Sequence, residues 1–93
     1  MRSAYYGTMY FVYVLRSELD HQLYVGYTTN VDQRVITHNK GSVPSTKSRR
    51  PLKLIFYEAY LSQEDAIRRE KYLKTTSGKG ALKHMLRETL KMQ

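Results

Sequence analysis

The feature that most constrains the fold is a nearly unbroken run of β-branched, aromatic and aliphatic residues from Tyr10 to Arg16, YFVYVLR. Such a run is typical of a strand that is buried on both faces, so it predicts the central strand of a sheet. The polar segment Ser17 to Gln22 follows, which indicates a hairpin and an antiparallel second strand. In that second strand Tyr24 and Gly26 share one face, and the glycine leaves room for a backbone or ligand to approach.

Capping residues divide the rest of the chain into helices around a third strand. Asn30 and Gln33 are the capping signal of a first helix that ends near Gly41, and Ser62 and Asp65 are a weaker signal for a second helix. The other expected segments are a third strand over 52–60, a helix break over 75–80 and a last amphipathic helix over 81–91 with Met85 facing inward. The fold class is therefore α+β in the order β-β-α-β-α-α, with one domain over 1–93, a core over about 10–74 and a C-terminal helix over about 80–91.

The charge of the chain indicates a polyanionic partner. Sixteen Lys and Arg against eight Asp and Glu give a net charge of +8, which favours nucleic acid, although a soluble domain can also simply be basic. Cysteine is absent, which excludes thiolate chemistry and fits a cytoplasmic location. No apolar run is long enough to span a bilayer, and the N-terminus does not resemble a secretory signal, so a membrane partner is not expected.

Three ionisable side chains are predicted at helix positions where ordinary surface charges are not expected. Arg34 and His38, four residues apart, border the inward stripe of the first helix, and Glu70 falls inside the apolar stripe of the second. An inward carboxylate is costly unless it is paired or metal-bound. The structural alternatives are an ion pair between Glu70 and Arg34 and a hydrogen-bonded His38 at the edge of the core. Glu58, at a strand end, is expected to be solvated.

These side chains suit phosphodiester hydrolysis. Arg34 can clamp a phosphate, and Glu70 can hold one Mg²⁺ or Mn²⁺ ion whose other ligands are waters and phosphate oxygens. The base that activates water is either Tyr24, which needs nearby positive charge to ionise, or His38, because free imidazole titrates near neutrality. No Ser-His-Asp motif or nucleotide-binding loop is evident, so no nucleotide cofactor is expected.

Basic and aromatic side chains outside this group are candidates for nucleic-acid binding. Lys47, Arg49 and Arg50 lie among small hydroxylic residues in a predicted loop over 42–51, a composition that grips phosphate oxygens or is simply solvated. Tyr27 is a further candidate, because tyrosines stack on bases and also fill cores.

Taken together, these residues resemble the GIY-YIG endonuclease family, in particular its small single-domain bacterial members. The match covers about 10–74 and rests on Val12-Tyr13-Val14, Tyr24-Val25-Gly26, Arg34, His38-Asn39, Ser48-Arg49-Arg50-Pro51 and Glu70. Two departures are that Phe11 and Val12 replace the first motif's Gly and Ile, and that Tyr27 replaces a Lys found in some relatives. The second departure favours His38 as the proton acceptor or relay.

The resemblance implies a three-stranded antiparallel sheet flanked by helices, with one divalent ion on Glu70. It also implies that Tyr24 is the general base, that Arg34 contacts the scissile phosphate and that Tyr13 helps to order the water. The expected function is a metal-dependent DNA endonuclease with a preference for branched or junction substrates, with DNA favoured over RNA. The alternatives are a non-catalytic nucleic-acid-binding module on the same fold and a homodimeric subunit that associates through its last helix.

Overall fold

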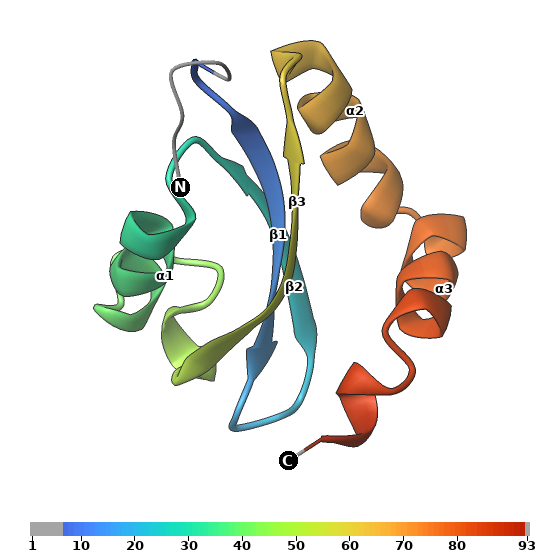
Figure 1. Cartoon of the computed structure of the whole chain (residues 1–93). Coiled ribbons are helices and arrows are strands. Elements are labelled where there is room, and N and C mark those ends of the chain that lie inside the picture. The colour runs from blue at the N-terminus through green and yellow to red at the C-terminus, as the bar shows by residue number, and fades with distance from the viewer. Residues whose placement is uncertain (1–6, 93) are drawn as a thin grey trace.

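The chain forms a three-stranded antiparallel sheet with helices on both faces, as the computed structural model describes it over residues 7–92 (Figure 1). The elements in chain order are β1 (Tyr10–Ser17), β2 (Leu23–Thr28), α1 (Val31–Asn39), η1 (Lys47–Arg49), β3 (Leu52–Tyr60), α2 (Gln63–Leu73), α3 (Thr76–Met85) and η2 (Thr89–Lys91), where η marks a 3₁₀ helix. The strand order β2-β1-β3 puts β1 in the centre, which confirms the interpretation of its hydrophobic run. The α+β class and the element order are confirmed as well.

The central strand is buried because helices cover both of its faces. Val12 and Val14 are fully buried on the face covered by α2 and α3, where Leu73 and Leu82 complete the core. Tyr13 is fully buried on the opposite face, the face covered by α1. Figure 1 shows α1 on one side of the sheet and both α2 and α3 on the other. Side chains of β1 therefore alternate between two separate layers.

The first two helices begin where their capping residues predict, and the first also ends where predicted. The Asn30 side chain accepts a hydrogen bond of 3.0 Å from the backbone N–H of Gln33, and the Ser62 hydroxyl accepts one of 3.3 Å from Asp65. Gly41, just beyond α1, has φ of +82°, the left-handed conformation for which glycine is favoured. Within residues 7–92, no helix has both the length and the apolar composition needed to cross a bilayer.

The predicted break between the last two helices is present but covers only residues 74–75 rather than 75–80, and the predicted start of the last helix at 81 is wrong. The Thr75 hydroxyl accepts a hydrogen bond of 3.0 Å from the N–H of Gly78 and caps α3, which begins at Thr76. The cap outweighs the low helix propensity of the two glycines. Met85, the last residue of α3, is 43% exposed rather than inward, whereas Leu86 is buried.

The expectation that Glu58 is solvated is also wrong. Two hydrogen bonds of 3.0 and 3.1 Å join its carboxylate to the guanidinium of Arg69, and the Tyr60 hydroxyl donates a third of 2.7 Å. The carboxylate is only 20% exposed because Arg69 of α2 lies over it. This bidentate pair neutralises Glu58 and leaves it poorly suited to bind a metal ion.

Candidate active site

The Tyr13 ring lies against the backbone of Gly26, its neighbour in the β1–β2 pairing. A Cβ atom added to Gly26 would overlap the Tyr13 ring. The room that the sequence indicated above Gly26 is thus occupied by a side chain of the protein itself. The glycine lets Tyr13 lie across β2, within reach of α1.

Four of the predicted residues form one cluster on the α1 face of the sheet. The Tyr13 hydroxyl lies 2.8 Å from Nε2 of His38, and Nε of Arg34 donates a hydrogen bond of 3.3 Å to the same hydroxyl. The Tyr24 ring centroid lies 4.9 Å from that of His38 and 6.3 Å from that of Tyr13. We refer to Tyr13, Tyr24, Arg34 and His38 as the tyrosine–arginine cluster.

The His38 imidazole is neutral and closed off from solvent. Its exposed fraction is 0%, and burial followed by the charge of Arg34 lowers its pKa to about 4. Nδ1 lies 2.8 Å from the hydroxyl of Thr46, which in turn donates a long hydrogen bond of 3.5 Å to the carbonyl of Val43. This series of hydrogen bonds places the proton on Nδ1 of His38 and leaves Nε2 to accept the hydrogen bond from Tyr13. The expectation that this imidazole titrates near neutrality is wrong, because burial disfavours the charged ring.

Tyr13 and Arg34 both stay protonated at neutral pH. Burial raises the pKa of Tyr13 to about 12, against an opposing hydrogen bond from Arg34. The pKa of Arg34 is raised above its ordinary value, chiefly by that same hydrogen bond. Arg34 uses Nε for the Tyr13 hydroxyl, so its two terminal nitrogens are the donors that a phosphate would meet.

The buried His38 predicts a specific loss of stability in acid. The pKa of His38 is lower in the folded chain, about 4, than its ordinary value of 6.5, so only the unfolded chain takes up a proton between these values. Its contribution is therefore complete above pH 6.5 and falls as the pH drops towards 4, by about 3 kcal/mol of unfolding free energy. Urea unfolding of the wild type and of His38→Gln at pH 7 and pH 4.5 measures the difference. His84→Gln, at an exposed histidine, should keep the wild-type pH dependence, and an unchanged dependence in His38→Gln would refute the assignment.

Lys74 links Glu70 to Tyr24, because it lies close to both. The Glu70 carboxylate is 18% exposed and lies 2.8 Å from Nζ of Lys74, the C-cap residue of α2. Nζ of Lys74 lies 5.8 Å from the ring centroid of Tyr24. Although α1 and α2 cover opposite faces of the sheet, these contacts place Glu70 near Tyr24 on the outer strand β2. The alternative ion pair between Glu70 and Arg34 is absent from the described part of the chain.

Lys74 is a residue of this site that the sequence reasoning missed. The signal was present, because a Glu and a Lys four residues apart on a helix are neighbours. Its contact with Tyr24 could not be deduced, since the two residues belong to separate elements. Lys74 supplies a positive charge beside Tyr24, where the substitution of Tyr27 for Lys had indicated that a cation was missing.

Glu70 fits a divalent ion as a single ligand. A carboxylate oxygen is a suitable ligand for Mg²⁺ or Mn²⁺, and Mg²⁺ commonly binds through one or two carboxylates plus waters and phosphate. Within residues 7–92, no three His, Asp or Glu side chains gather into a metal-ligand group. The residues therefore fit an ion that binds weakly until a phosphate supplies further oxygens.

Tyr27 lies apart from the tyrosine–arginine cluster. It belongs to the opposite face of β2, where its ring stacks on Tyr10 with 6.4 Å between centroids. Its hydroxyl accepts a hydrogen bond of 3.1 Å from the side chain of Gln63. Tyr24 and Tyr27 therefore lie in different layers, because residues an odd number of positions apart point to opposite faces of a strand.

The predicted phosphate-binding loop is partly structural. The Arg49 guanidinium lies 3.6 Å from the Asp20 carboxylate and donates to the carbonyl of Leu23 at 3.5 Å, so it ties η1 to the β1–β2 hairpin. Lys47 and Arg50 are exposed, and Nε of Arg50 donates 2.8 Å to the Lys47 carbonyl. Of the three residues, Lys47 and Arg50 remain accessible to a nucleic acid.

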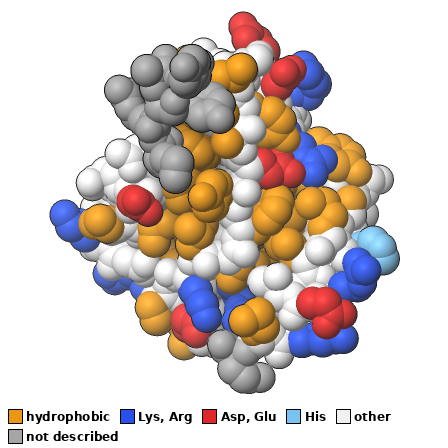
Figure 2. All heavy atoms as spheres, in the orientation of Figure 1, with side chains coloured by type: hydrophobic (Ala, Val, Ile, Leu, Met, Phe, Trp, Pro, Cys, Tyr) orange, Lys and Arg blue, Asp and Glu red, His pale blue; other side chains and the backbone are white. Residues whose placement is uncertain are grey.

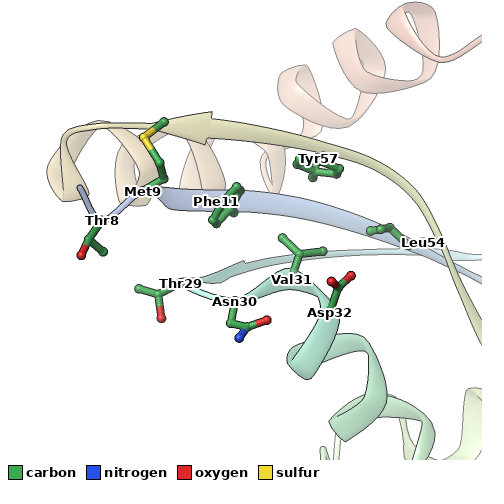
Figure 3. A pocket seen from close by; sticks show the side chains of 9 residues that line it. All are labelled: Thr8, Met9, Phe11, Thr29, Asn30, Val31, Asp32, Leu54 and Tyr57. Atoms are coloured by element: carbon green, nitrogen blue, oxygen red, sulfur yellow. The ribbon is translucent and has the colours of Figure 1, made fainter. Parts of the chain in front are cut away.

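A separate hollow of about 330 Å³ lies at the N-terminal end of α1 (Figure 3). Phe11 and Tyr57 contribute to its lining, as does the Asp32 carboxylate, and among residues 7–92 neither Lys nor Arg lines it. Negative charge without a compensating cation disfavours a phosphate there. The hollow also contains none of the predicted site residues, which separates it from the tyrosine–arginine cluster.

Comparisons with known proteins show which proteins this chain is similar to. A family model described as the GIY-YIG catalytic domain matches residues 9–84. UPF0213 protein SH2523 of Staphylococcus haemolyticus is 44% identical over 75 residues, which cover 80% of this chain and 90% of that protein. A UPF0213 protein of Pediococcus pentosaceus is 40% identical over 77 residues, with 82% and 80% covered. The solution NMR structure of UPF0213 protein BH0048 from Bacillus halodurans aligns with a TM-score of 0.53 at 34% identity, covering 83% of this chain and 84% of that one.

Proposed function

Because the chain belongs to the GIY-YIG family, a family of nucleases, we propose that it is a divalent-metal-dependent endonuclease that hydrolyses phosphodiester bonds in DNA. One observation carries the proposal, a series of contacts that joins a guanidinium to a carboxylate across the sheet. Arg34 contacts Tyr13, Tyr13 lies beside Tyr24, and Lys74 links Tyr24 to Glu70. A phosphate-binding cation, a phenol and a metal-binding acid therefore lie within one region.

Arg34 is the proposed ligand of the scissile phosphate. Tyr13 holds its Nε, and His38 holds Tyr13 in turn, so the guanidinium has a defined orientation. The planar guanidinium can donate two parallel hydrogen bonds to phosphate oxygens through its terminal nitrogens. Positive charge at this point stabilises the negative charge that builds up on those oxygens as water attacks.

Tyr24 is the proposed general base, in preference to His38. Tyr24 is only half-buried, and its side chain lies close enough to Tyr13 and Arg34 to raise the pKa of both, whereas both nitrogens of His38 are occupied in a buried pocket. As phenolate, Tyr24 would take the proton of a water molecule whose oxygen then bonds to phosphorus, and the leaving sugar oxygen departs with the bond electrons. Nζ of Lys74 lies 5.8 Å from the centroid of this ring, on the side of Glu70.

Glu70 is the residue that would hold a Mg²⁺ or Mn²⁺ ion. Such an ion supplies charge stabilisation for the leaving oxygen when it is bound. Lys74 now neutralises the Glu70 carboxylate, so its ammonium group must release the carboxylate for the ion. The released ammonium group would remain close to Tyr24 and to the incoming phosphate.

Cleavage of defined substrates tests the proposal. The purified chain is incubated with flap, nicked and duplex DNA and with the matching RNAs, with and without Mg²⁺ or Mn²⁺. We expect metal-dependent cleavage of DNA that Tyr24→Phe lowers by at least about 10²-fold, since a general base contributes about that much. Tyr57→Phe, at an exposed tyrosine on β3, is the matched control. Failure to cut any substrate would refute the nuclease, and full activity in Tyr24→Phe would refute the assigned base.

A non-catalytic nucleic-acid-binding module on the same fold is the second candidate. The ion pair between Glu70 and Lys74 favours it, because this carboxylate is already neutralised without a metal ion. In that case binding would be salt-sensitive and would survive both Glu70→Ala and Arg34→Ala, with no metal-stimulated turnover.

A further inference from the structure

A groove of about 450 Å³ runs between β2 and the helices α2 and α3, and it meets the candidate active site at Tyr24. We propose that this groove binds an unpaired nucleic-acid strand next to the phosphate that is cut. The inference rests on the proposed function and adds the class of substrate, a nucleic acid with a single-stranded segment. We refer to the hollow as the lysine groove, after its cationic residues Lys74, Lys79 and Lys83.

The charge of the lysine groove is of one sign. Lys79 and Lys83 lie one turn apart on α3, so they project from the same side of the helix. Both are exposed, and neither pairs with a carboxylate within residues 7–92, whereas Lys74 pairs with Glu70. In the described part of the chain, no Asp or Glu lines the groove. By contrast, acidic, basic and apolar side chains are interspersed on the face drawn in Figure 2.

The floor of the groove is apolar. Leu23 of β2 and Leu82 of α3 are among its lining residues, and Tyr24 adds an aromatic ring at the end nearest the cluster. Proteins that bind single strands combine cations for the phosphates with apolar and aromatic surfaces for exposed base faces. In a duplex the base faces are stacked inside the helix and cannot reach such a floor. The combination of lysines and apolar floor therefore favours an unpaired strand.

Tyr24 connects the lysine groove to the tyrosine–arginine cluster. Tyr24 contacts Lys74 and His38, so it belongs to both the lysine groove and the tyrosine–arginine cluster. A strand in the groove would therefore lead directly to the phosphate that Arg34 holds. These lysines could instead have a structural role. Cations beside an outer strand discourage pairing with the strands of other molecules, and this role requires no binding of nucleic acid.

Salt-dependent binding tests the lysine groove without catalysis. Lys79→Gln/Lys83→Gln is compared with the wild type in EDTA, by fluorescence anisotropy of a labelled oligo-dT and of a duplex of equal length. We expect single-strand affinity to fall at least tenfold and the slope of log K against log salt to shrink by about 1.4, since each lost phosphate contact contributes about 0.7. Duplex affinity should change much less.

The matched control is Lys40→Gln/Lys53→Gln, which removes the same charge from two exposed lysines outside the groove. An equal loss in this control would show a net-charge effect and overturn the proposal. So would an equal loss of duplex binding, or a larger loss from Lys47→Gln/Arg50→Gln in the η1 region. Because EDTA prevents metal-dependent cleavage, the result is decisive whether or not the protein proves to be a nuclease.

Discussion

Replacing Glu70 with Gln should lower metal-stimulated cleavage by about 10³-fold and leave the fold intact. Gln has nearly the same shape and can still accept a hydrogen bond from Lys74, so the packing of α2 should be retained. It lacks the negative charge that a divalent ion needs from a site with a single carboxylate ligand. Cleavage rates at several Mn²⁺ concentrations, together with Mn²⁺ binding followed by electron paramagnetic resonance, measure both effects.

Glu88→Gln is the matched control for this change. It makes the same substitution at a carboxylate that is 78% exposed and pairs with Lys91, away from Tyr24. We expect wild-type cleavage and wild-type Mn²⁺ binding from it. Cleavage that persists in Glu70→Gln would mean that this carboxylate does not hold the ion and that the proposed site is wrong.

Replacing Gly78 with Ala should destabilise the fold by about 3 kcal/mol or more. A Cβ atom at Gly78 would overlap the backbone carbonyl of Tyr72 and would lie 2.7 Å from Cα of Leu73. These are backbone atoms at the end of α2, so the clash can be relieved only by moving α3 away from α2. Thermal unfolding should show a fall of more than about 10 °C, given the size of the domain.

Gly80→Ala, in the same helix, should change the stability in the opposite direction. Nothing lies within 4 Å of a Cβ atom at Gly80, so only helix propensity changes. This variant should gain up to about 1 kcal/mol of stability. A mild effect in Gly78→Ala would show that the junction between α2 and α3 can adjust, contrary to its close packing.

Local signals predicted most of the fold. The third strand was expected over 52–60 and lies at Leu52–Tyr60, because a run of strand-forming residues ends at turn and capping residues. Asn30 and Ser62 cap their helices as expected, since an N-cap involves only residues three positions apart. The same local reasoning made the break after α2 too long, because the capping hydroxyl of Thr75 starts α3 ahead of the two glycines that had indicated a break.

The candidate site was only partly predictable. Spacing along α1 identified Arg34 and His38 as unusual, but not that both meet the hydroxyl of Tyr13, which lies more than twenty residues away in the sequence. The protonation of His38 could not be predicted either. It depends on burial and on the charge of Arg34, which exist only after the layers have packed.

The sequence by itself determined the order of the elements, the central position of β1 and the residue types needed to bind phosphate and metal. These follow from hydrophobic period, capping chemistry and charge, which act over a few residues. Only the tertiary structure decided that Lys74 joins Glu70 to Tyr24 and that Tyr27 serves the other face. It also decided that the lysines of α3 line a groove along β2. These relations depend on how separate elements pack, because distances between remote side chains are set by the whole core.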